Sequence, residues 1–468
     1  MASAHRARLG AAFFIACCGC SGSQSSPSAP SGRSGPTADF SEPLVDGGLG
    51  LRAPPGAAAS LPPDAAVTAE TPSIPAARVL GIDTVAESER VASIAVLPAD
   101  RGYLLASVTY VDQVLPALRN SPATRPRAAA SAPRAATVVV RALDGRGSLK
   151  KSPTVVSAKA ESVGGVALAP SASDPGEAAL AWVGVDGGLG QVFLTRIGRS
   201  GEKLGQRMIT RSKGGCSDVG VAAIKGGYVA AWLDQRDARA AVYVAKVSRE
   251  LERIGDEHRI ADAKGEASQI RLVADGDQVV LAWSEAREEE GSSGIFSARL
   301  GDDLSIRAEP SRAFRASRSA SSLQLARFQN GWVYGWVEAA GTEKARAGAS
   351  RRGVALAWVD AAFRGVGEAM TLSLPLDPSA LALDCGNPRA QAASRCHAVI
   401  SGGEEGQLSF YGFGYRPGDA IEAPTRLASM AGPSTEDTSA VLIEGRLFFA
   451  EDDLRGGGRL RVAQLDWR

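Results

Sequence analysis

Residues 228–247, YVAAWLDQRDARAAVYVAKV, contain the pattern from which the fold is predicted. An apolar run ends at Trp232, an acid follows at Asp234, and a second apolar run opens with Tyr243. Both runs are rich in Val and Ala, and neither has a long apolar stripe of period 3.6. The stretch is therefore typical of two consecutive β-strands rather than of a helix.

The same pattern recurs along the chain. Apolar runs that end in tryptophan are found in AALAWVGVD, YVAAWLDQRD, VVLAWSEARE and WVYGWVEAA, and their tryptophans are Trp182, Trp232, Trp283 and Trp336. These are separated by 50, 51 and 53 residues, as expected for a four-stranded blade of a β-propeller. The sequence therefore predicts an all-β propeller.

Weaker copies of the pattern extend the series in both directions. Gly102–Val111 matches the second strand of a first blade, and Cys396–Ser401 and Leu447–Glu451 match second strands of a sixth and a seventh. Trp358 follows Trp336 by only 22 residues, so it belongs to a third strand of blade five. We predict seven blades, with six or eight as open alternatives.

The two ends of the chain complement each other. The chain stops at RLRVAQLDWR, a third strand of the last blade, while a surplus strand at Val79–Ala86 precedes the first inner strand at Val91–Leu97. An open ring would expose unpaired backbone N–H and C=O groups. We therefore predict that blade seven combines one N-terminal strand with three C-terminal strands.

The first twenty residues are typical of an export signal. Basic residues precede the short apolar run Leu9–Ala16, which is followed at once by cysteines. The stretch resembles a bacterial lipobox with Cys20, preceded by the small Gly19, as the lipidated residue, and Cys17 as the alternative. An ordinary secretory leader with incidental cysteines remains open.

Residues 21–77 are dense in Ser, Pro, Ala and Gly, so this segment is expected to be a disordered tether. The propeller is expected to occupy residues 78–468. Together these segments predict an exported monomer that is lipid-anchored to the outer membrane, on its periplasmic or cell-surface side, and that contacts the membrane through the anchor alone.

The overall charge and the histidine content exclude several classes of function. The formal net charge is +1, so no basic field indicates a nucleic-acid partner. The chain has three histidines, of which His5 lies in the leader, whereas His258 and His397 are isolated in expected strands. We therefore expect no metal site and no cofactor.

Two stretches, WLDQRDARAAVYVAKV and WSEAREEEGSSGIFSARL, resemble a repeat of extracellular bacterial β-propellers. The repeat consists of Trp, an acid two residues later, Arg two further, and an Ile/Val–aromatic pair that opens the next strand. The matching residues are Trp232, Asp234, Arg236, Val242 and Tyr243 in one blade, and Trp283, Glu285, Arg287, Ile295 and Phe296 in the next. Gly184 replaces the acid in blade two, and Ala340 replaces the arginine in blade five. The resemblance implies a fold and an exported location, but no particular activity.

Four acids at equivalent positions are expected to form a ring on one rim of the propeller. These are Asp234, Glu285, Glu338 and Glu451. Such a ring can bind a cation or a basic ligand, or it can tie strand ends together with Arg236 and Arg287. Since duplicated features usually serve each blade, we favour the structural role.

The cysteines of the propeller suggest one disulfide. Cys385 and Cys396 flank the hairpin DCGNPRAQAASRC and are expected to be paired in an oxidising compartment. Cys216 is then left single. No histidine lies near it in sequence to activate it, so it is expected to be an inert thiol.

No catalytic constellation is recognisable in the sequence, so we predict a non-catalytic envelope lipoprotein, not an enzyme, whose propeller is a platform for an envelope protein or a glycan. The alternative is a polysaccharide hydrolase or lyase with two carboxylates in the central funnel. A structural role within an envelope complex is a third possibility.

Overall fold

The computed structural model describes residues 77–467, except residues 88, 111–135, 158–163, 172–173, 237–239, 263–264, 287–293, 317–319, 340–351, 362–368, 387–394, 420, 432–438 and 453–457. The expected leader, both candidate lipidation sites (Cys17 and Cys20) and nearly all of the expected tether lie outside these residues. So does Arg287.

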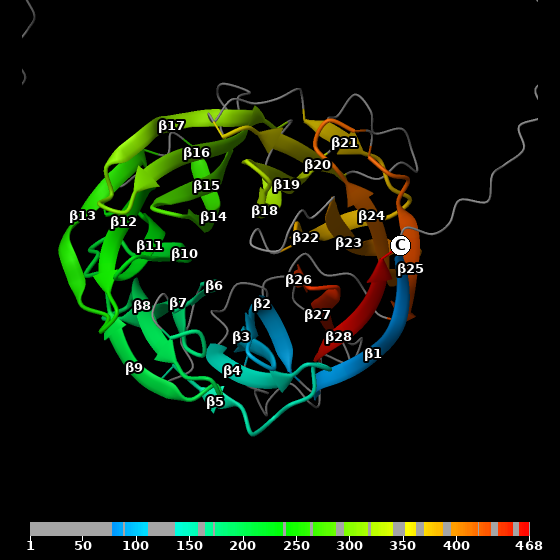
Figure 1. Ribbon diagram of the computed structural model, residues 1–468, viewed down its shortest axis with the longest axis horizontal. Helices are drawn as coiled ribbons and strands as arrows, with labels where there is room; N and C mark the ends of the chain where they lie inside the picture. Colours follow the sequence, from blue (N-terminus) through cyan, green and yellow to red (C-terminus); the bar gives the residue numbers. More distant parts are fainter. Residues whose placement is uncertain are drawn as a thin grey trace, which may run out of the picture. The chain divides into compact units, whose positions relative to one another are not determined.

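The described strands form seven four-stranded antiparallel sheets arranged as a ring (Figure 1). From the axis outward, blade one contains β2 (Arg90–Ala99), β3 (Gly102–Tyr110), β4 (Ala136–Asp144) and β5 (Thr154–Val155). Blade two contains β6 (Val166–Pro170), β7 (Ala178–Asp186), β8 (Leu189–Ile197) and β9 (Lys203–Met208). Blade three contains β10 (Cys216–Ile224), β11 (Gly227–Asp234), β12 (Ala241–Ser248) and β13 (Arg253–Asp262).

The remaining blades follow the same order. Blade four contains β14 (Glu266–Asp275), β15 (Gln278–Ala286), β16 (Gly294–Gly301) and β17 (Ile306–Arg315). Blade five contains β18 (Ala320–Phe328), β19 (Gly331–Ala339), β20 (Arg352–Val359) and β21 (Met370–Leu372). Blade six contains β22 (Asp377–Asp384), β23 (Cys396–Glu404), β24 (Gln407–Tyr415) and β25 (Thr425–Ala431). Blade seven contains β26 (Ala440–Ile443), β27 (Arg446–Asp452), β28 (Gly458–Trp467) and β1 (Ala77–Glu87).

The predicted seven-bladed fold is confirmed, and so is the way the ring closes. The N-terminal strand β1 pairs antiparallel with β28 along its length, from Ala77 opposite Trp467 to Glu87 opposite Arg459. Trp358 lies in β20, the third strand of blade five, as the spacing predicted. The described residues contain no helix of the length and apolarity that crossing a bilayer would need.

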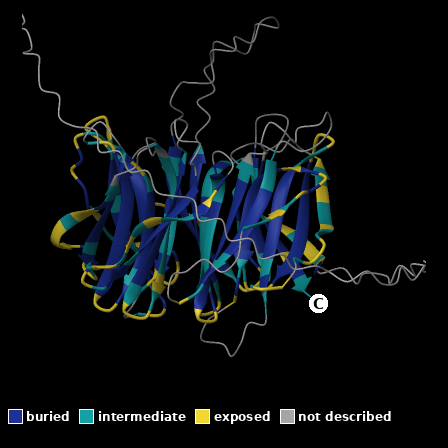
Figure 2. Ribbon diagram, turned by 90° about the horizontal axis from the view of Figure 1, so that it is seen from above, coloured by how far each residue is buried: buried dark blue, intermediate teal, exposed yellow. Residues whose placement is uncertain are grey.

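The core lies between neighbouring blades, where most residues of the second strands are buried. Figure 2 shows buried residues along the strands and exposed residues at many of the turns. Trp232 and Trp283 are at most 1% exposed and stack on Tyr243 and Phe296 of the adjacent third strand. Since a buried indole contributes a large apolar area, each repeat supplies the ring that fills its own blade interface.

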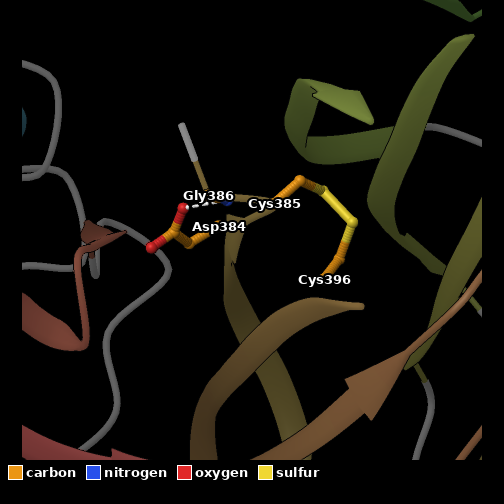
Figure 3. Close-up of a disulfide and its surroundings, with 4 residues drawn as sticks. All are labelled: Asp384, Cys385, Gly386 and Cys396. Atoms are coloured by element: carbon orange, nitrogen blue, oxygen red, sulfur yellow. Dashed lines mark hydrogen bonds between the residues drawn. A yellow bond between two sulfur atoms is a disulfide. The ribbon is translucent and has the colours of Figure 1, made fainter. Parts of the chain in front are cut away.

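A disulfide joins Cys385 and Cys396 at the end of the β22–β23 hairpin (Figure 3). The bond closes the hairpin of blade six, and both cysteines are buried. Beside it, Asp384 Oδ1 accepts a hydrogen bond from the Gly386 N–H (2.8 Å), and its Oδ2 accepts one from the N–H of Glu444 in blade seven (2.7 Å). The clipped hairpin therefore also holds the junction between blades six and seven.

We predict that replacing both cysteines by serine lowers the free energy of unfolding by about 3 kcal/mol, because the 11-residue separation is no longer closed in the unfolded chain. Urea unfolding of the oxidised protein and of the Cys385→Ser/Cys396→Ser variant measures this difference. Cys216→Ser serves as a control for loss of a buried thiol. An unfolding midpoint that does not change upon reduction would contradict the prediction.

Candidate functional site in the central channel

The acids of the expected rim ring lie at the ends of second strands, and three of them bind the tryptophan of their own blade. Trp232 Nε1 donates to Asp234 Oδ2 (3.2 Å), Trp283 Nε1 to Glu285 Oε2 (3.4 Å), and Trp336 Nε1 to Glu338 Oε2 (3.2 Å). Asp234, Glu285 and Glu451 are nearly fully buried. These carboxylates are thus occupied within their blades and do not form an open ring of ligands.

Blade two shows what the acid does, because Gly184 stands in its place. There Trp182 Nε1 donates instead to Thr195 Oγ1 (3.1 Å), which lies on the neighbouring strand β8. In blade seven, Glu451 Oε2 accepts a hydrogen bond from Arg461 Nε (2.5 Å). The partner changes from blade to blade, whereas the need to satisfy a buried polar group remains.

Asp234 is the centre of a buried network in blade three. Its Oδ1 accepts hydrogen bonds from Ser212 Oγ (2.7 Å) and the Arg236 N–H (2.9 Å), and its Oδ2 pairs with the Arg236 guanidinium (2.5 Å). Burial raises the pKa of the Asp234 carboxyl, but the hydrogen bonds from Arg236 and Ser212 outweigh it and hold the pKa below its usual value. Arg236 also lies 4.3 Å above the ring of Tyr243 and pairs with Glu257. In this blade, the repeat motif therefore ties strand ends together.

The remaining candidate groups carry no chemistry. Burial raises the pKa of the Cys216 thiol to about 12, so it is protonated at neutral pH and is a poor nucleophile. The His397 ring stacks on Trp467 at 4.3 Å, and burial lowers the pKa of its imidazole. Within the described parts of the chain, no three His, Cys, Asp or Glu side chains gather as a metal site would require.

A central cavity of about 530 Å³ is lined by the innermost strands of the blades. Its volume lies in the usual range for a small-molecule or saccharide site. The residues come from seven separate chain segments, one per blade. Only closure of the ring brings them together.

A β-bulge at the start of each of several inner strands directs a polar side chain to the next blade. Asp218, Gln269 and Ser322 have positive φ angles of 42°, 61° and 51° and lie at these bulges. Four junctions are tied by a side-chain acceptor and a backbone N–H of the following blade. These bonds are Asp218–Ile270 (2.8 Å), Gln269–Leu323 (2.5 Å), Ser322–Leu381 (2.8 Å) and, across the closure, Ser439–Ile94 (3.2 Å).

One register position of the inner strands is blade-specific. The residues at this position, which pair with the second-strand residue just before the tryptophan or its counterpart, are Ala95, Ala167, Gly220, Arg271, Gln324, Ala382 and Val441. Five of them are small or apolar, whereas Arg271 and Gln324, in adjacent blades, are long and polar and line the cavity. Structural repetition does not require these two side chains.

Arg271 and Gln324 retain hydrogen-bonding capacity. Arg271 Nη1 donates to the Ile270 carbonyl (2.8 Å), and no acid in the described residues forms an ion pair with it. A guanidinium has five N–H donors, so most of them are available. Asp218 is the one carboxylate in the described lining of the cavity, and its Oδ1 and Oδ2 accept the N–H groups of Val219 (2.9 Å) and Ile270. The sequence did not point to these residues, since none lies in the repeat motif.

No protein-family model and no curated protein matches the chain. Solved structures similar to it include an α-L-arabinofuranosidase from Fusarium graminearum in complex with an iminosugar inhibitor (9% identity, 81% of this chain and 98% of that chain, TM-score 0.43). Two others are an endo-arabinase from Bacteroides thetaiotaomicron (14%, 54% and 89%, TM-score 0.31) and the polysaccharide lyase Uly1 (11%, 80% and 89%, TM-score 0.45).

These findings correct one prediction from the sequence. The chain was expected not to be an enzyme, because its motifs contain no catalytic constellation. The solved structures named above are instead an α-L-arabinofuranosidase, an endo-arabinase and a polysaccharide lyase, and this finding contradicts the expectation. The repeat motifs describe what all blades share, whereas a ligand site arises where the blades differ.

We predict that the stability supplied by Asp234 depends on pH in a defined direction. Because the pKa of Asp234 is lowered in the folded state, its contribution is present above the unfolded pKa, at roughly pH 4, and is lost as pH falls further. The Asp234→Asn variant should therefore lose less stability than the native protein between pH 7 and low pH. Chemical unfolding across this range measures the difference, with Asp277→Asn, on an exposed turn, as the control. Parallel pH profiles of the native protein and Asp234→Asn would contradict the prediction.

Proposed function

We propose that this propeller binds a polysaccharide at its central channel and cleaves it. The observation that carries the proposal is the polar wall formed by Arg271 and Gln324 in a cavity whose equivalent positions are otherwise small or apolar. Ligand sites combine a concave cavity with a few convergent polar groups, and this lining has that composition. The small residues opposite leave space for a sugar ring.

Serine hydroxyls and amides complete the polar lining. Ser321, Gln269 and Ser379 belong to the cavity wall together with Arg271 and Gln324. Hydroxyl and amide groups both donate and accept, as sugar hydroxyl groups do. Ser321 and Ser379 donate to the carbonyls of Val337 and Ser401, so their oxygen lone pairs are what they can offer to a sugar hydroxyl group. The Arg271 guanidinium adds a positive charge to this wall.

Of the two cleavage chemistries, elimination fits the described lining better than hydrolysis. Hydrolysis of a glycosidic bond ordinarily uses a pair of carboxylates, and Asp218 is the one carboxylate that the described lining supplies. In an elimination, negative charge develops on the substrate, and a guanidinium such as that of Arg271 stabilises it. Asp218 can take the proton from the carbon beside a uronate carboxylate, because its two backbone hydrogen bonds leave further lone pairs free. As the C=C bond forms, the C–O bond to the leaving sugar breaks, and water gives a proton to the departing oxygen.

We predict that Arg271→Ala and Gln324→Ala each reduce polysaccharide cleavage by at least about tenfold, the loss expected when a charged or polar contact in a dry site is removed. Asp218→Asn keeps an acceptor for one backbone N–H but cannot take the proton, so it should abolish cleavage while substrate still binds. Reducing-end release and the ultraviolet absorbance of unsaturated products, measured on neutral arabinan and on uronate-rich polymers, follow the reaction.

The matched control for the channel variants is Arg307→Ala, an exposed arginine on β17 outside the cavity. It should leave both cleavage and binding unchanged. If new reducing ends appear without an unsaturated product, the reaction is hydrolysis and not elimination. The proposal fails if the native protein neither binds nor cleaves any of the polymers.

We also propose that the protein is exported and lipid-anchored at Cys20, with Cys17 as the alternative site, and that residues 21–77 act as the tether. The Cys385–Cys396 disulfide supports an oxidising location, since disulfides persist outside the cytosol. The propeller would then meet polysaccharide at the cell envelope.

We predict that Cys20→Ser prevents attachment of fatty acid and releases the protein from the membrane fraction. Metabolic labelling with a fatty-acid analogue, followed by fractionation, measures both effects, and Cys18→Ser is the control. If Cys17→Ser alone abolishes labelling, the anchor is at Cys17. Absence of label in the native protein would rule out the anchor.

A further inference from the structure

A second cavity, of about 310 Å³, lies at the outer edge of the propeller between blades two and three. One wall comes from β9 and the segment that follows it, with Arg207 and Arg211. The other comes from the β12–β13 turn, with Glu252 and Arg253. Since the central channel is built from innermost strands, this edge pocket is separate from it.

The floor of the edge pocket is apolar and rigid. Ile209 and Leu251 are 5% and 2% exposed and belong to the same core cluster. The backbone beside Arg211 is also fixed, because Gln191 Oε1 accepts hydrogen bonds from Thr210 Oγ1 and the Ser212 N–H, both at 2.8 Å. The Arg211 side chain is therefore exposed, whereas its backbone is held in place by the hydrogen bonds of its two neighbours.

Positive charge exceeds negative charge around this pocket. Arg207 Nε donates to Glu252 Oε1 (3.1 Å), and Arg253 lies 3.6 Å from Glu257, which Arg236 also binds. Arg211 forms no ion pair with any residue that the structure describes. One guanidinium of the pocket is thus left without an acid, while the other two already have fixed geometry.

Charge at the turns between third and fourth strands varies from blade to blade, and the β8–β9 turn has Glu202 and Lys203 at the positions of Glu252 and Arg253. The β16–β17 turn has the same form as the β12–β13 turn, since Leu251 and Leu304 are both buried and have φ angles of 67° and 66°. At the following positions, however, Ser305 and Ile306 replace Glu252 and Arg253. The propeller fold therefore does not require charge at this place.

We propose that the edge pocket binds an anionic oxygen group, a sulfate, phosphate or carboxylate, with Arg211 as its main contact and Arg207 and Arg253 at its sides. Guanidinium groups bind such oxyanions through paired N–H···O bonds. The apolar floor accepts the carbon face of the molecule that bears the anion. This site is independent of polysaccharide cleavage in the channel.

The test is a titration of the full-length protein with inorganic sulfate, inorganic phosphate and glucuronate, with chloride at matched ionic strength as the reference. Calorimetry gives the affinity, and the thermal unfolding midpoint gives the stabilisation of the folded state. Arg211→Gln should weaken binding by at least about tenfold, the loss of a charge-assisted pair. Arg211→Lys keeps the charge without the paired donors and should give an intermediate affinity.

A matched control separates a site from a general salt effect. Arg307→Gln removes an exposed arginine on β17 and should bind the anions as the native protein does. If sulfate raises the thermal unfolding midpoint of the native protein and of Arg211→Gln by the same amount, the effect is a general one of sulfate and the proposal is overturned. The three probes show which anion the pocket prefers, and failure of all of them overturns the proposal without touching the channel.

Discussion

The ring depends on hydrogen bonds that run from one inner strand to the next around the axis. Neighbouring blades do not pair their strands with each other, so the inner edges need other partners for their backbone N–H groups. Asp218, Gln269, Ser322 and Ser439 accept four of these groups from side chains at the strand starts. The Ser439 bond and the β1–β28 pairing close the circle. A buried N–H left without a partner costs about 1–3 kcal/mol, so these junctions constrain every other feature.

Between the blades, the same demand for satisfied polar groups explains the repeated tryptophan and acid. The indole fills the interface, but its N–H is buried with it and needs an acceptor. Asp234, Glu285 and Glu338 provide one two residues further along the same strand, and Thr195 provides it in blade two. The most conspicuous pattern of the sequence is therefore a structural device, and the acids that suggested a rim of ligands are already occupied.

The side chains proposed to bind a ligand lie where the blades differ in sequence. In the channel, Arg271 and Gln324 replace small or apolar residues, and at the edge of blades two and three no acid among the described residues pairs with Arg211. Both places combine a cavity with donors that the fold does not use. In a repeat protein, the positions that are equivalent in all blades stabilise the ring. The positions that differ between blades are the ones that can bind a ligand.

The sequence by itself determined the repeat, the strand order within a blade and the closing strand, and it favoured seven blades over six or eight, because each depends on local alternation and on spacings near 50 residues. It also pointed to the Cys385–Cys396 pair, whose partners are close in the chain. It could not indicate which residues line the channel, because Asp218, Arg271 and Gln324 are ordinary residues in three separate blades and become neighbours of one cavity when the ring closes. Only the tertiary structure decided which acids are occupied and which cations are free, since a side chain's partner depends on the neighbouring strand and blade rather than on its place in the repeat.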